Sequence, residues 1–237
     1  DSVYDAHTGE DLLPKVREMV KEKGFLPQDA EQRDQSWLDT YGMVQTIMAD
    51  FPEFLPNTYD QYYLYPDYKV SHLDPNFTRA DEVMAGREKR VFTECAEVIK
   101  EGKLGDKFHA ISDAHAEMMI KVAEAIAYNK NDRHILIVEN NGAIANMQDD
   151  AMVEVVCELG INGPRPMRVG NIPQFNLGLL VNQVSCEKLI VDAYFENSYQ
   201  KALEAFTLNR LINDAKKARK VLDALIEANK GMWPELR

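Results

Sequence analysis

The chain has 237 residues, of which 45% are hydrophobic and 28% are charged, and its formal net charge is −12. This is enough apolar material for one large domain or two small ones. The acidic balance argues against a basic nucleic-acid groove and against a polybasic membrane patch. No apolar run reaches the ~18 residues of a membrane span, and residues 1–4 do not resemble a signal peptide. We therefore expect a cytoplasmic protein.

The first half of the chain is predicted to be helical. Apolar residues recur at helical spacing from 12 to 20 and from 37 to 47, and these segments are ended by Gly24 and Pro52. A longer helix is predicted over 79–100. Another should begin at Ser112 or Asp113, with an inner face formed by His115, Met118, Met119, Val122 and Ile126.

The second half combines strands and helices. Residues 134–138 are predicted to form a buried strand, and the alternation over 152–159 indicates a half-buried one. Residues 160–166 are expected to be a tight connection, after which 167–169 pair back. Three helices should follow, over 174–197, after Ser198 and after Asp214. Because the strands are joined through turns, we predict a helix-rich α+β chain with a small, mainly antiparallel sheet.

The chain has three cysteines, Cys95, Cys157 and Cys186. An odd number without motif spacing does not indicate a disulfide framework. All three lie in apolar stretches, which favours buried, reduced thiols.

A tyrosine-rich stretch follows the second predicted helix. Five of the ten tyrosines of the chain lie within 59–68, and Arg79 and Arg87 follow on the long helix. One interpretation is an aromatic corner that packs a loop onto the core, since buried tyrosines bond their hydroxyls. The alternative is a catalytic phenol and an anion-binding arginine that face one pocket.

Other chemical motifs are absent from the sequence. None of the twelve glycines forms a G-x-G-x-x-G or Walker loop, so we expect no cofactor-binding residues for NAD in this chain. His109, Asp113 and His115 lie close together, but His-x5-His does not place both rings on one helix face. Structural histidines are therefore favoured over a metal site, and no metal ligands are predicted.

Several long motifs occur in the order seen in one known family. They are PNTYDQYYLYPDY, TRADEVMAGRE, HILIVENNGAIANM, AMVEVVCELGINGPRPMRVGNIPQF and LIEANKGMWPEL. Together they resemble the carboxy-terminal half of the 6-phospho-α-glucosidases of glycoside hydrolase family four. These are NAD-dependent enzymes that do not follow the usual two-carboxylate mechanism. The resemblance covers essentially all of residues 1–237 and implies one substrate-binding and catalytic-base domain, similar to the carboxy-terminal domain of lactate dehydrogenase.

The resemblance also implies a mechanism. In the family, NAD takes hydride from C3 of the phosphorylated glucose, a tyrosine removes the C2 proton, and a divalent metal, usually manganese, stabilises the enediolate. Tyr59 matches the tyrosine base, and Arg79 matches an arginine near the substrate that we expect to contact the sugar phosphate. Asp81 and Asn141 occupy motif positions near the pocket and are the remaining predicted substrate-binding residues.

The family's dinucleotide-binding Rossmann half, metal ligands and acid carboxylate would lie upstream of this chain. We therefore expect the chain alone to be inactive and to bind neither NAD nor manganese tightly, with the missing Rossmann half and a second copy in a homo-oligomer as its partners. Two alternatives remain open. One is another substrate in the same family, as in a 6-phospho-β-glucosidase, an α-galactosidase or a glucuronidase relative. The other is a freestanding binding or oligomerisation fragment without catalysis.

Overall fold

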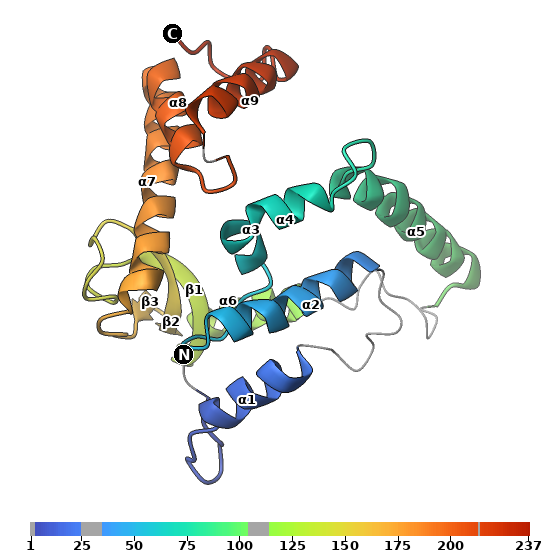
Figure 1. Cartoon of the computed structure of the whole chain (residues 1–237). Helices are drawn as coiled ribbons and strands as arrows, with labels where there is room; N and C mark the ends of the chain where they lie inside the picture. Colours follow the sequence, from blue (N-terminus) through green and yellow to red (C-terminus); the bar gives the residue numbers. More distant parts are fainter. Residues whose placement is uncertain (1–2, 25–34, 104–113, 213) are drawn as a thin grey trace. The chain divides into compact units, whose positions relative to one another are not determined.

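The computed structural model describes residues 3–24, 35–103, 114–212 and 214–237. It confirms a helix-rich α+β chain with a small antiparallel sheet (Figure 1). The chain divides into two compact units, Asp1–Asn76 and Phe77–Arg237. None of the described helices is both long and apolar enough to cross a membrane.

The first unit contains four helices: α1 (Leu13–Lys23), α2 (Gln35–Asp50), α3 (Asp60–Leu64) and α4 (Pro66–Ser71). The two predicted helices are confirmed as α1 and α2. They pack through Val20, Val44 and Met48, which are buried, and Leu55 closes the same cluster. The apolar spacing of both helices therefore buries one stripe of each against the other.

The second unit begins with α5 (Arg79–Glu101) and includes α6 (Ala114–Ala127). The predicted start of α6, at Ser112 or Asp113, lies outside the described residues, as does His109. The predicted inner face of α6 is wrong, since Met118, Met119 and Ile126 are exposed whereas Ala125 is fully buried. Helical period alone could not tell which side of α6 would be covered, because a small alanine makes the close contact.

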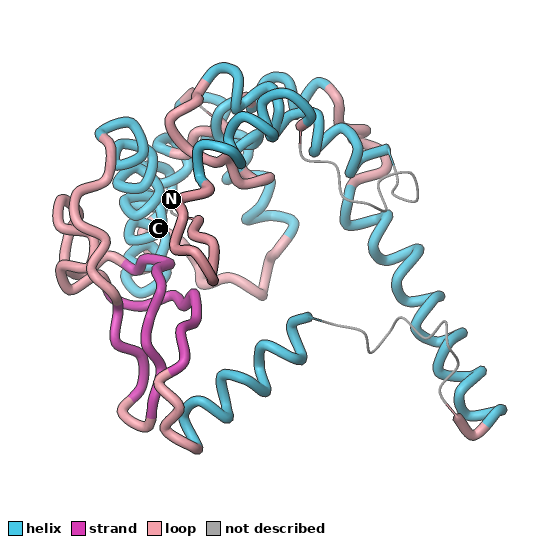
Figure 2. Tube along the Cα trace, turned by 90° about the horizontal axis from the view of Figure 1, so that it is seen from below, coloured by secondary structure: helices cyan, strands magenta, loops and turns pink. Residues whose placement is uncertain are grey.

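The sheet of the second unit has three antiparallel strands in the order β1 (Asp132–Glu139), β2 (Met152–Gly160) and β3 (Gly163–Pro166), drawn in magenta in Figure 2. The first two strands are confirmed, but the prediction that 134–138 is a buried strand is wrong. One face of β1 is open, since Ile135 and Ile137 are 59% and 68% exposed. The prediction for the third is wrong: the turn is shorter than expected, and Cys157 pairs with Pro166. Pro164 and Pro166 are tolerated because β3 is an edge strand of this sheet.

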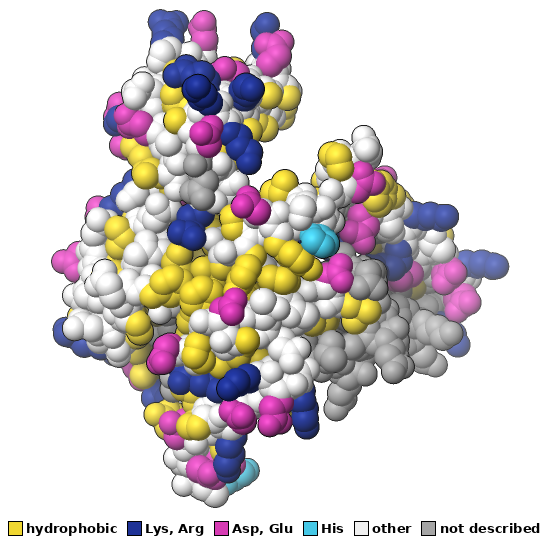
Figure 3. All heavy atoms as spheres, in the orientation of Figure 1, with side chains coloured by type: hydrophobic (Ala, Val, Ile, Leu, Met, Phe, Trp, Pro, Cys, Tyr) yellow, Lys and Arg dark blue, Asp and Glu magenta, His cyan; other side chains and the backbone are white. Residues whose placement is uncertain are grey.

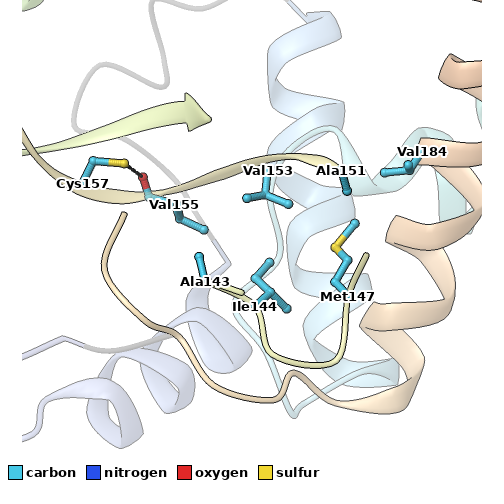
Figure 4. Packing of buried hydrophobic residues seen from close by; sticks show 8 residues of the cluster. All are labelled: Ala143, Ile144, Met147, Ala151, Val153, Val155, Cys157 and Val184. Carbon is cyan, nitrogen blue, oxygen red and sulfur yellow. Dashed lines mark hydrogen bonds between the residues drawn. The ribbon is translucent and has the colours of Figure 1, made fainter. Parts of the chain in front are cut away.

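The inner face of the sheet covers the main core of the second unit. Figure 4 shows Val153 and Val155 of β2 facing Ala143, Ile144 and Met147 of the loop between β1 and β2. Helix α7 (Gln174–Glu196) adds Val184 to this cluster. The predicted alternation of β2 is thus confirmed by burial, because every second residue points into the core.

Two further helices, α8 (Tyr199–Leu208) and α9 (Ala215–Ala228), follow α7. Ser198 and Asp214 cap them as predicted, since Ser198 Oγ accepts from Lys201 N and Asp214 Oδ1 accepts from Lys217 N. Figure 3 shows dark blue Lys and Arg side chains gathered over α8 and α9. Those on the first turns of α9 are exposed: Lys216, Lys217, Arg219 and Lys220.

The three cysteines are unpaired. Cys157 and Cys186 are buried as predicted, and burial raises the pKa of both thiols. The prediction for Cys95 is wrong, because this residue is exposed on α5. An apolar neighbourhood in the sequence did not distinguish the covered side of that helix from its solvent side.

Candidate functional site

Tyr59 stands at the amino-terminal end of α3 in the first unit. Helix α2 ends at Asp50, and the loop that follows leads to a turn in which Asn57 Oδ1 accepts from Tyr59 N at 2.8 Å. In return, Asn57 N donates to Asp60 Oδ2 at 2.8 Å. Burial raises the pKa of the Asp60 carboxyl, and this hydrogen bond opposes the rise. The side chains of this turn replace backbone partners and so begin α3.

The Tyr59 side chain is 68% exposed, so its phenol is accessible on the first unit. Its ring contacts that of Tyr62, with 6.2 Å between centroids. The Tyr62 ring in turn lies 5.3 Å from Lys69 Nζ, within reach of a cation–π interaction. A lysine cation therefore lies near the ring of Tyr62, which is the ring that Tyr59 contacts.

The other tyrosines of the stretch have structural contacts. Tyr65 Oη donates to Asp50 Oδ2 at 2.5 Å, and this joins the end of α3 to the end of α2. Burial, followed by the hydrogen bond and charge of Asp50, raises the pKa of Tyr65 to about 12. Tyr68 stacks on His72 with 4.1 Å between ring centroids. The aromatic-corner interpretation thus describes Tyr65, whereas Tyr68 is 39% exposed.

Arg79 and Asp81 lie together on the first turn of α5 in the second unit. Asp81 forms a capping box with Thr78: its Oδ2 accepts from Thr78 N at 2.8 Å and from Thr78 Oγ1 at 2.7 Å. These bonds, led by that of the Thr78 hydroxyl, hold the pKa of Asp81 below its usual value. Arg79 Nη1 donates to Glu82 Oε2 at 2.5 Å, in an exposed ion pair.

Asn141 lies in a separate segment, the turn after β1. Its φ is +41°, a left-handed conformation that asparagine tolerates better than most residues. Its backbone N–H donates to Asp149 O at 2.9 Å, and its exposed side chain donates to Glu139 Oε2 at 3.2 Å. The side-chain amide of Asn141 is thus accessible, while its backbone N–H holds the turn through Asp149 O.

Sequence reasoning missed two buried amides beside these predicted residues. Gln61, next to Tyr59, and Asn140, next to Asn141, are 1% and 0% exposed. Asn140 Nδ2 donates to the carbonyls of Ile144, Met147 and Gln148, and its Oδ1 accepts from Ile144 N. A run of polar residues in a turn gives no signal of which amide will point inward.

The described residues do not fit a metal centre of their own, since no group of three or more His, Cys, Asp or Glu side chains among them could hold a metal ion. The predicted site residues themselves are a phenol, an arginine, a carboxylate and an amide. Such groups can accept a proton, bind an anion and donate hydrogen bonds to sugar hydroxyls.

Comparison with known proteins defines the class. The Family 4 glycosyl hydrolase C-terminal domain matches residues 1–212, so a glycoside hydrolase domain accounts for most of the chain. The chain belongs to glycosyl hydrolase family 4.

Two named relatives are both maltose-6′-phosphate glucosidases. The chain is 48% identical over 231 residues to MalH of Clostridium acetobutylicum, covering 96% of this chain and 52% of that protein. It is also 48% identical over 229 residues to the enzyme of Bacillus subtilis, covering 96% of this chain and 51% of that one. The chain spans about half the length of the curated relatives that it matches.

Two crystal structures of 6-phospho-α-glucosidases from gut microorganisms share the fold. One, in complex with NAD and Mn²⁺, has a TM-score of 0.92 and 80% identity, covering 100% of this chain and 54% of that one. The other, in complex with NAD and glucose 6-phosphate, has a TM-score of 0.89 and 44% identity, covering 97% and 53%.

Proposed function

We propose that this chain is the substrate-binding and catalytic-base part of a 6-phospho-α-glucosidase, which hydrolyses 6-phosphorylated α-glucosides such as maltose 6-phosphate. The observation that supports this most is the 48% identity to maltose-6′-phosphate glucosidases over 96% of the chain. Identity to a probable 6-phospho-β-glucosidase of Bacillus subtilis is lower, at 30% over 197 residues. This difference favours 6-phospho-α-glucosides over 6-phospho-β-glucosides.

In this proposal, Tyr59 Oη accepts the proton from C2 of the sugar. The support is its match to the tyrosine of the family motif and its exposure of 68% at the start of α3. A base must reach the proton to within hydrogen-bonding distance, so an accessible phenol on a bonded turn suits this role.

Arg79 is proposed to bind the 6-phosphate, because a guanidinium offers five N–H donors in a planar fork that matches phosphate oxygens. Asn141 is proposed to contact sugar hydroxyls through its exposed amide. Asp81 is proposed to act close to the substrate, although its carboxylate already caps α5 through Thr78. Its support is therefore the motif position, together with the adjacent Arg79.

NAD and Mn²⁺ are proposed as cofactors of the complete enzyme, where they supply a hydride acceptor and charge stabilisation when bound. The support is that a crystal structure with 80% identity contains both. We propose that a dinucleotide-binding half outside these 237 residues contributes most of their contacts. A homo-oligomer and a cytoplasmic location are proposed on the family resemblance, and the unpaired cysteines suit a reducing compartment.

A chimeric enzyme tests the proposal. In it, this chain replaces the matching segment of the 80% identical 6-phospho-α-glucosidase, and the unaltered enzyme is the control. We expect NAD- and Mn²⁺-dependent release of 4-nitrophenol from 4-nitrophenyl 6-phospho-α-glucoside. At least ~100-fold less should come from the unphosphorylated glucoside, because a site built to bind a group discriminates against substrates that lack it. A preference for the β-anomer, or for the unphosphorylated sugar, would contradict the proposal.

A further inference from the structure

A buried glutamine holds the backbone next to Tyr59. Gln61 is 1% exposed, although it lies two residues from the exposed Tyr59. Its Nε2 donates to the Thr58 carbonyl oxygen at 2.7 Å and to Thr40 Oγ1 of α2 at 3.3 Å. Gln61 thus joins helix α2 to the residue that immediately precedes Tyr59.

Gln61 is one of two side chains that hold the peptide group between Thr58 and Tyr59. The carbonyl of Thr58 and the N–H of Tyr59 belong to one planar, rigid unit. Gln61 Nε2 binds the carbonyl, and Asn57 Oδ1 accepts from the N–H at 2.8 Å. The peptide that follows Tyr59 is fixed as well, because Tyr62 N donates to Tyr59 O at 3.0 Å. The two peptides together set the direction in which the Tyr59 side chain leaves the backbone.

Contacts of the Tyr59 ring alone do not fix the position of its phenol. The Tyr59 side chain is 68% exposed, and its ring contact is with Tyr62, at 6.2 Å between centroids. A catalytic group must be held to within ~0.5 Å of its productive position. The position of the Tyr59 phenol therefore depends on its backbone, and hence on the amide of Gln61.

The Oε1 atom of Gln61 indicates that a glutamine at this position contributes more than apolar packing. Its Oε1 is buried and has no hydrogen-bond partner among the described residues. A buried acceptor without a partner lowers stability. A methionine would fill the same space without that cost, so what Gln61 contributes is its Nε2 donor.

We infer that Gln61 is a positioning residue for Tyr59, which orients the catalytic phenol by holding the Thr58 carbonyl against helix α2. The inference rests on the proposed function, in which Tyr59 removes the C2 proton. Gln61 does not touch the substrate in this account. Its effect is on the rate of proton removal rather than on sugar binding.

Gln61→Met in the chimeric enzyme tests the inference. We expect kcat to fall by ~10- to 100-fold while KM stays within ~3-fold, because misplacing a reacting group by about 1 Å costs up to ~100-fold in rate. Exchange of the C2 hydrogen in D₂O should fall by the same factor as kcat. The matched control is Gln45→Met on α2, since Gln45 Nε2 also donates to two acceptors, Lys21 O and Glu22 O, far in sequence from Tyr59. It should keep kcat within ~2-fold.

The variant Gln61→Glu tests whether a fall in kcat comes from a misplaced Tyr59 or from a poorly folded protein. A protonated carboxyl can donate to the Thr58 carbonyl, whereas a carboxylate cannot. The ratio of kcat for Gln61→Glu to kcat for Gln61→Met should therefore rise as the pH is lowered. A ratio that does not change with pH would overturn the inference, and so would equal kcat values for Gln61→Met and Gln45→Met.

The variant Tyr59→Phe shows whether a negative result concerns the positioning role of Gln61 or the proposed function of Tyr59 as the base. If Tyr59→Phe keeps wild-type C2 exchange, the proposed base is wrong, whatever Gln61 does. If Tyr59→Phe loses exchange while Gln61→Met matches Gln45→Met, only the positioning role is overturned.

Discussion

The Tyr65 phenol donates a hydrogen bond to Asp50 Oδ2 at 2.5 Å. Burial, followed by this hydrogen bond and the charge of Asp50, raises the pKa of the Tyr65 phenol to about 12, above the ~10 of an unfolded tyrosine. A raised pKa in the folded state means that folding favours the protonated phenol. The resulting stability is complete below pH ~10 and is lost as the pH rises towards 12.

Tyr65→Phe should therefore remove part of the alkaline sensitivity. We expect the free energy of unfolding of the wild type to fall more steeply between pH 10 and 12 than that of Tyr65→Phe. The measurement is urea unfolding across this range, with tyrosinate absorbance recorded in parallel. Parallel curves for the two proteins would show that Tyr65 does not titrate in this way.

The motif position of Asp81 predicts a residue that binds substrate. In the structure its carboxylate is half of the capping box that begins α5. Thr78→Val removes the hydroxyl that contributes most to the lowered pKa of Asp81. The pKa should rise towards its ordinary value, as measured by carbon-13 NMR of the carboxyl. Thr93→Val is the control, since its hydroxyl donates to Lys89 O on the same helix. An unchanged pKa in Thr78→Val would contradict the capping box.

The sign of this linkage is opposite to that of Tyr65. The folded pKa of Asp81 lies below its unfolded value, so its contribution to stability is present above the unfolded pKa of ~3.9. It is lost as the pH falls through the folded value. Acid should therefore loosen the first turn of α5, while alkali weakens the junction of α2 and α3.

At the scale of elements, the loop between β1 and β2 depends on one buried side chain. Asn140→Ala leaves the carbonyls of Ile144, Met147 and Gln148 without their Nδ2 donor, and we expect a loss of about 3 kcal/mol of local stability. Asn141→Gly, one residue on, should change it by less than about 0.5 kcal/mol because that side chain is exposed. Hydrogen exchange of the β2 amides measures both. Equal protection in the two variants would contradict this account of the loop.

The elements show how far sequence reasoning extends. Strand β2 could be predicted, because alternate burial of Val153, Val155 and Cys157 follows from its pattern. Strand β3 could not, since Gly163 and Pro164 are typical of a turn and only the pairing with β2 makes them a strand. Motif resemblance selected Tyr59, whereas the burial of Gln61 depends on its contact with Thr40 of α2, 21 residues away. Such contacts are not encoded in local periodicity.

At the scale of the whole molecule, the chain corresponds to about half of the relatives it matches. The described residues contain no cluster that could hold a metal ion, and the sequence has no dinucleotide fingerprint. We therefore expect the 237-residue chain alone to bind no NAD in isothermal titration calorimetry, whereas the chimeric enzyme does. Tight binding of NAD by the chain alone would contradict the proposal that a dinucleotide-binding half outside these 237 residues supplies most of the NAD contacts.

The central claim is that Tyr59 removes the C2 proton of a 6-phosphorylated α-glucoside. The most direct test follows the C2 hydrogen by NMR while the chimeric enzyme turns over maltose 6-phosphate in D₂O. The account predicts deuterium at C2 in the glucose 6-phosphate released by the wild type, and a rate of incorporation at least ~100-fold lower in Tyr59→Phe, since general base catalysis contributes about that much. Incorporation by Tyr59→Phe at the wild-type rate, or a product without deuterium from the wild type, would contradict it.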